Sequence, residues 1–145
     1  MKTCKLLREQ VAAATGSKKA ELVLKNAQIV NVFTQSVETG DIAIEGGYIV
    51  GIGNYEGITE KDLGGAYVCP GFLDGHIHIE SSMTSPGEFE RAVVPHGTIA
   101  VITDPHEIAN VAGTAGIRFM MQSAQKLDLD VYFMLPSCVP ATDLD

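Results

Sequence analysis

The feature that most constrains this fold is the alternation of strand and helix patterns after residue 66. Residues 98–103 and 131–135 are continuous apolar runs rich in β-branched and aromatic side chains, which is typical of strands buried on both faces. Between such runs lie helix patterns at 85–97 and 112–126. The first starts with a capping Ser85, Pro86 at the first helical position and Glu88 three residues after the cap. This β-α-β-α-β order predicts parallel strands joined by right-handed crossovers.

Two architectures accommodate that order, a doubly wound sheet and the first part of a (β/α)₈ barrel. A complete barrel needs about 200–250 residues, and residues 66–145 hold at most three of its strands.

The preceding residues follow a different pattern. Residues 1–19 are predicted to hold a helix over 3–15, capped by Thr3 and ended by Gly16. Residues 20–65 are predicted to form the N-terminal part of a small, composite β domain. Gly46-Gly47 separates two apolar runs and indicates a tight hairpin, because such turns need positive φ. Residues 54–65 are polar and glycine-rich, which favours a loop.

Composition excludes several classes of function. A net charge of −8 and a pI near 4.8 argue against a nucleic-acid partner. No stretch approaches the roughly 18 apolar residues of a membrane span. The three cysteines, one of them Cys138, are an odd number without a CxxC pair, which is typical of reduced thiols in a cytoplasmic protein and argues against a cysteine-based zinc site.

The strongest candidate for chemistry is the pair His76 and His78. On a strand, residues i and i+2 point to the same face, so both imidazoles can converge on one cation. The pair lies at the carboxyl end of a strand, where parallel α/β folds place their sites. The alternative is that one of the two is a hydrogen-bonded core or surface histidine.

Polar residues next to this pair, and after the following strand, are candidates for the surroundings of a metal or substrate. Glu80 and Ser82 could orient a substrate or fix the imidazoles, although serines here could also only bond within the turn. Asp104 could set the tautomer of a ligand histidine, and His106 could shuttle a proton or be a further ligand. Helix capping by Asp104 and Glu107 is the alternative.

Other polar residues are weaker candidates. Asp74 is predicted to be a structural carboxylate, and Ser137 and Thr142 are predicted to be turn residues.

The segment Pro70–His78 resembles the first-strand signature of the amidohydrolase superfamily, whose members share a small β domain and a metal-bearing (β/α)₈ barrel. Within this superfamily, the adenine deaminases are the members that three blocks of the chain resemble: residues 76–83 (HIHIESSM), 103–111 (TDPHEIANV) and 132–142 (YFMLPSCVPAT). The resemblance implies an α/β chain, with a small N-terminal β-sandwich-type unit followed over 66–145 by the first β/α units of an incomplete barrel.

The same resemblance implies hydrolytic deamination of adenine to hypoxanthine and ammonia in purine salvage. It assigns His76 and His78 to one of two divalent ions, with Mn or Fe favoured and Zn possible, which would activate water for attack on the purine. The general base and the remaining ligands are expected beyond Asp145, so this chain is expected to be an inactive fragment. Its open strand edge is expected to promote self-association or a homo-oligomer.

Two other functions stay open. One is a different amidohydrolase acting on a cyclic amide, as dihydroorotases and hydantoinases do. The other is a non-catalytic assembly module in which the histidines bind no metal.

Overall fold

The computed structural model describes residues 3–137 and 139. The chain divides into two compact units, Met1–Pro70 and Gly71–Asp145. The division falls five residues later than the expected domain start at residue 66, because β5 (Tyr67–Val68) pairs with β1 (Ala20–Asn31) of the first unit. Cys138 and Thr142 lie outside the described residues. No helix in the described part of the chain is long and apolar enough to cross a membrane.

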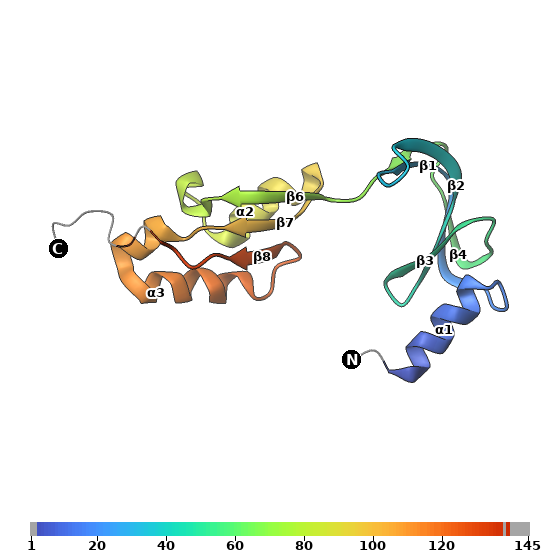
Figure 1. Ribbon diagram of the computed structural model, residues 1–145, viewed down its shortest axis with the longest axis horizontal. Helices are drawn as coiled ribbons and strands as arrows, with labels where there is room; N and C mark the ends of the chain where they lie inside the picture. The colour runs from blue at the N-terminus through green and yellow to red at the C-terminus, as the bar shows by residue number, and fades with distance from the viewer. Residues whose placement is uncertain (1–2, 138, 140–145) are drawn as a thin grey trace. The chain divides into compact units, whose positions relative to one another are not determined.

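The first unit is built on one mixed sheet, in the order β3-β2-β1-β4, with β5 also paired to β1 (Figure 1). β2 (Ser36–Glu45) and β3 (Tyr48–Gly53) form the predicted hairpin. Gly46 and Gly47 have φ values of 57° and 76°, so both adopt the left-handed conformation that the turn requires.

One expectation for the first unit was wrong. β4 (Gly57–Asp62) lies within the predicted loop, where its parallel pairing with β1 stabilises a strand whose side chains are mostly exposed and polar. The described residues of the unit form one sheet, so a sandwich-type unit stays a prediction. The helix α1 (Cys4–Ala14) covers part of the sheet, and Ala13 packs with the buried side chains of Val23 and Ala43.

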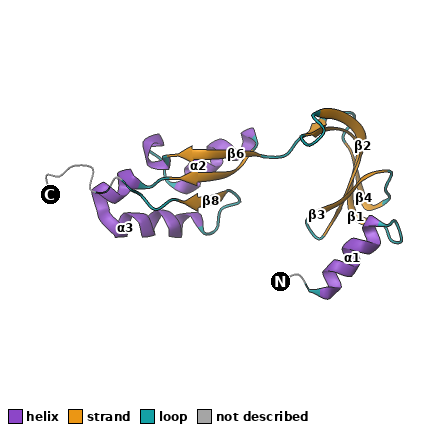
Figure 2. Ribbon diagram, viewed as in Figure 1, coloured by secondary structure: helices purple, strands orange, loops and turns teal. Residues whose placement is uncertain are grey.

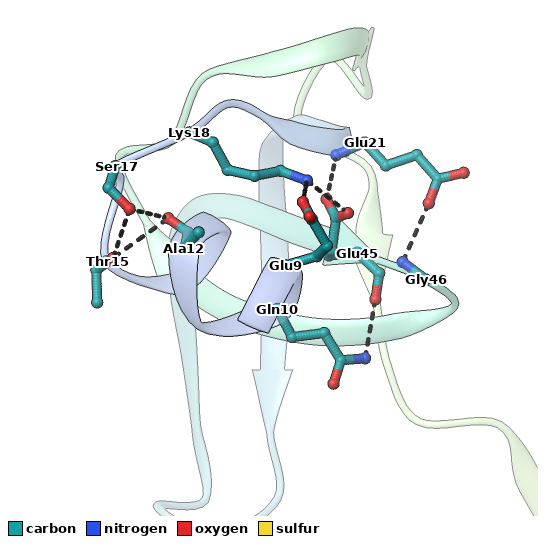
Figure 3. A network of polar contacts seen from close by, with 9 residues as sticks. All are labelled: Glu9, Gln10, Ala12, Thr15, Ser17, Lys18, Glu21, Glu45 and Gly46. Carbon is teal, nitrogen blue, oxygen red and sulfur yellow. Dashed lines mark hydrogen bonds and ion pairs between the residues drawn. The ribbon is translucent and has the colours of Figure 1, made fainter. Parts of the chain in front are cut away.

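A polar network anchors α1 and the following turn to the sheet (Figure 3). The Lys18 ammonium donates to Glu9 at 2.7 Å and to Glu45 at 2.8 Å. The second carboxylate oxygen of Glu45 accepts from the backbone N–H of Glu21 at 2.9 Å. The backbone carbonyl of Glu45 accepts from the side-chain amide of Gln10 at 3.2 Å. Glu45 is therefore a buried carboxylate that joins the helix, the turn and two strands.

We expect the melting temperature of the chain to fall steeply in acid. The hydrogen bond from Lys18 lowers the pKa of Glu45 below its usual 4.5, and that from Lys25 lowers the pKa of Asp41 below its usual 3.8. Each carboxylate therefore contributes stability that is complete above its unfolded pKa and is lost as the pH falls through the lower folded pKa. Thermal melts followed by circular dichroism over this range check the expectation. Glu45→Gln should flatten the pH dependence, whereas Glu56→Gln, which alters an exposed ion pair, should leave it unchanged.

The second unit holds three parallel strands in the order β6-β7-β8, formed by Phe72–Ile77, Thr98–Thr103 and Asp130–Phe133 (Figures 1 and 2). The short 3₁₀ helix η1 (Ile79–Ser82), α2 (Pro86–Val93) and a second 3₁₀ helix η2 (Val94–His96) connect β6 to β7, and α3 (His106–Ala124) connects β7 to β8. This confirms the predicted β-α-β-α-β order. A (β/α)₈ barrel stays an expectation, because three strands do not close one.

The core of this unit lies on one face of its sheet. Five buried side chains pack together there: Ile79, Phe89, Val101, Met120 and Leu129. They come from η1, α2, β7, α3 and the segment before β8, so both helices pack on the sheet through this cluster. β6 and β8 each keep one edge without a neighbouring strand among the described residues. The expected self-association through such an edge stays a prediction.

Two local expectations for this unit were also wrong. Ser85 occupies the N-cap of α2, but its side chain makes no capping hydrogen bond in the structure. α3 begins at His106 rather than near residue 112, because the first turn is held by groups from another loop that local sequence patterns do not reveal.

Candidate metal centre

Parallel pairing brings the residues that follow β6 and β7 to the same edge of the sheet. Ile77 pairs with Thr103, and the backbone N–H of Asp104 then donates to the Ile77 carbonyl at 3.0 Å. Hydrogen bonding between these two segments of the chain therefore continues past the ends of the strands. As a result, Asp104 lies beside His78, which is 26 residues earlier in the sequence.

The two histidines face away from the core. Ile77 packs against the apolar cluster and Ile79 is fully buried in it, so the imidazoles of His76 and His78 occupy the other face of the extended chain. Their Nε2 atoms are 3.1 Å apart, and their ring planes make an angle of 80°. The two rings therefore converge, as their spacing predicted.

The tautomer of His78 is set by the residue that follows the neighbouring strand β7. Its Nδ1 lies 2.9 Å from the backbone carbonyl oxygen of Asp104. A carbonyl oxygen only accepts, so Nδ1 carries the proton and donates it. In the neutral ring this leaves the lone pair on Nε2, which is the atom that faces His76.

These groups fit a divalent cation. Two nitrogens bound about 2.0–2.1 Å from one ion, at tetrahedral or octahedral angles, lie about 2.8–3.4 Å apart. The observed separation of 3.1 Å falls within that range. Ligand atoms of His76, His78 and Asp104 all lie within 4.8 Å of one another. The buried Oδ1 of Asp104 has no hydrogen-bond partner among residues 3–137 and 139, so an acceptor remains available for a cation.

A second grouping adjoins the first. His106 packs edge-on against His78, with ring centroids 4.7 Å apart, and its Nδ1 lies 3.3 Å from Oδ2 of Asp104. Ligand atoms of His78, His106 and Glu107 also lie within 4.8 Å of one another. Both residues that the sequence predicted here therefore contact the site. Asp104 lies against His78, and His106 contacts both His78 and Asp104.

The polar residues of η1 divide between local and long-range partners. Glu80 accepts from the backbone N–H of Ile108 through Oε1 at 3.3 Å, and its buried Oε2 has no partner in the described part of the chain. Ser82 donates to the Ile79 carbonyl at 2.6 Å, a bond within its own turn. Asp74 accepts from the backbone N–H of His76 at 3.1 Å, which agrees with its predicted structural role.

Sequence reasoning missed one contact at this site. The hydroxyl of Ser81 lies 2.7 and 2.8 Å from the two carboxylate oxygens of Glu107. Both residues stand in polar blocks that follow neighbouring parallel strands, and that shared position is the signal that could have paired them.

Comparisons with known proteins agree with these observations. A sequence model described as the amidohydrolase family matches residues 67–145. The chain is 59% identical over 141 residues to adenine deaminase 2 of Carboxydothermus hydrogenoformans, covering 97% of this chain and 25% of that protein. It is 58% identical over 139 residues to the adenine deaminase of Geobacillus kaustophilus, covering 96% and 24%.

A further relative, the adenine deaminase of Listeria monocytogenes serotype 4b, is 50% identical over 145 residues, covering 99% of this chain and 25% of that protein. The chain thus spans about a quarter of the length of the curated relatives it matches.

Proposed function

Because this chain belongs to the amidohydrolase family, we propose that it supplies the first part of the divalent-metal site of an adenine deaminase. The reaction is the hydrolysis of adenine to hypoxanthine and ammonia. The observation that carries the proposal is the convergence of the Nε2 atoms of His76 and His78 at the carboxyl end of β6. The names of the relatives, which are adenine deaminases at 50–59% identity, support adenine as the substrate.

In this proposal His76 and His78 hold the ion through Nε2, and the Asp104 carbonyl keeps the proton of His78 on Nδ1. When bound, divalent ions supply the Lewis acidity that makes water a nucleophile near neutral pH. Imidazole nitrogens suit several divalent metals. The resemblance to adenine deaminases favours Mn²⁺ or Fe²⁺ over Zn²⁺.

Glu80 is the proposed purine contact on this chain. Its Oε1 is engaged by the backbone of α3, whereas its buried Oε2 has no partner among the described residues. Adenine carries N–H donors on its exocyclic amine and on its five-membered ring. A carboxylate oxygen is an acceptor for either donor, and a charged acceptor makes the stronger hydrogen bond.

A chimera tests the proposed activity. This chain replaces the matching segment of the Geobacillus kaustophilus relative, which is 58% identical over 139 residues. We expect the purified, Mn²⁺-loaded chimera to convert adenine to hypoxanthine, measured by chromatography, and to leave dihydroorotate and hydantoin intact. A folded, metal-loaded chimera without adenine turnover would contradict the proposal, and turnover of a cyclic amide would favour the other amidohydrolase chemistry.

A further inference from the structure

The helix α3 is two helical segments joined at a sharp corner. Gly113 has φ 55° and ψ −146°, a backbone conformation that lies outside the helical region and is close to one that only glycine adopts readily. The segment before it, residues 106–112, carries His106 and Glu107. The bend can be followed in Figure 1.

A second glycine fixes where residues 106–112 lie. A Cβ built on Gly116 would be 2.7 Å from Cγ1 and 2.8 Å from the carbonyl oxygen of Ile108. In a continuous helix, residues eight positions apart are separated by about 12 Å along the axis. Residues 106–112 therefore fold back onto the rest of α3, and the contact is close enough to exclude any side chain at position 116.

The other side of residues 106–112 is tied to η1 by two carboxylates that point in opposite directions. Glu80 of η1 accepts from the backbone N–H of Ile108 at 3.3 Å. Glu107 of α3 accepts from the hydroxyl of Ser81 at 2.7 Å. We call this pair of contacts the η1–α3 clasp. It connects the loop that follows the metal-binding histidines to the segment that carries His106.

We propose that the η1–α3 clasp and the Gly113 corner position His106 against His78 and Asp104, and so fix the Asp104 carboxylate for the cation. The inference rests on the proposed function. The path runs from Ser81 to Glu107, through the backbone to the adjacent His106, and from the Nδ1 atom of His106 to Oδ2 of Asp104 at 3.3 Å. Ser81, Glu107 and Gly113 are positioning residues in this scheme.

The test uses the whole 145-residue chain and three serine variants. Hydrogen exchange and the nuclear Overhauser contact between the rings of His78 and His106 report the position of residues 106–112 without any metal. A Co²⁺ titration followed by visible absorption reports the site. We expect Ser81→Ala to speed exchange in residues 106–112, to weaken the ring contact and to lower Co²⁺ affinity by about 10–100-fold. Ser81→Thr, which keeps the hydroxyl, should restore all three.

The matched control is Ser85→Ala, since Ser85 makes no capping bond and should change none of these readouts. Gly113→Ala should resemble Ser81→Ala, while Gly87→Ala, at an uncrowded helical position, should not. An unchanged ring contact in Ser81→Ala would overturn the proposal, as would a lost contact with wild-type Co²⁺ affinity. Absence of Co²⁺ binding by the unaltered chain would count against the metal-binding function, and the exchange and ring-contact results would still decide whether the clasp holds His106.

Discussion

Replacing His78 by alanine in the chimera should lower kcat/KM for adenine by more than about a thousandfold. The change removes one of the two convergent Nε2 atoms and the imidazole whose tautomer is fixed by Asp104. A bound ion contributes several kcal/mol to stabilising charge in the transition state, and about 4 kcal/mol corresponds to a thousandfold in rate. Steady-state assays, with metal content measured by atomic emission on the same samples, check the expectation.

His96→Ala is the control for the loss of a histidine as such. His96 lies in η2 and is exposed, and neither candidate metal grouping includes it. The His96→Ala chimera should keep its kcat/KM for adenine and its metal content. If the His78→Ala chimera kept its metal and its rate, the histidines would have no role in metal binding, and the reading of this chain as an assembly module would stand.

Replacing Ile79 by alanine should destabilise the second unit by about 2–5 kcal/mol. The Ile79 side chain is fully buried in the cluster with Phe89, Val101 and Met120, so truncation leaves a cavity that the surrounding helices and strand cannot fill without moving. Urea denaturation followed by circular dichroism measures the loss.

Ile99→Ala is the matched control, because Ile99 is an isoleucine of the same unit with half of its surface exposed. It should cost much less than Ile79→Ala. Equal losses for the two variants would mean that the cluster around Ile79 is not the core of the second unit.

Patterns in the sequence were sufficient for the elements whose side chains are buried in a regular rhythm. The apolar run at 98–103 is β7, the run at 131–135 overlaps β8, which ends at Phe133, and the Gly46-Gly47 link is the β2–β3 turn. β4 was missed because its stability comes from main-chain bonds to β1, which leave no alternation of apolar and polar side chains. The sandwich-type unit stays a prediction, because the described residues hold one sheet that the helix α1 partly covers.

For the site, spacing alone predicted the convergence of His76 and His78, because the two-residue repeat of a strand is a local property. The contacts between the loops could not be predicted from local sequence patterns. Ser81 meets Glu107, and Glu80 meets Ile108, only because β6 and β7 are neighbours in a parallel sheet. The corner at Gly113 was not predicted because the expected helix began near residue 112, so residues 106–112 were not assigned to a helix at all.

The acceptor for the proton of His78 belongs to the peptide backbone. Every amino acid placed at position 104 brings the same carbonyl, so side-chain mutagenesis there leaves that acceptor in the chain. Asp104→Asn or Asp104→Ala consequently isolates the carboxylate's contribution while the imidazole keeps its protonation pattern. To remove that acceptor from His78, the register of β6 against β7 would have to shift, because an ester in place of the peptide link would only weaken the carbonyl as an acceptor.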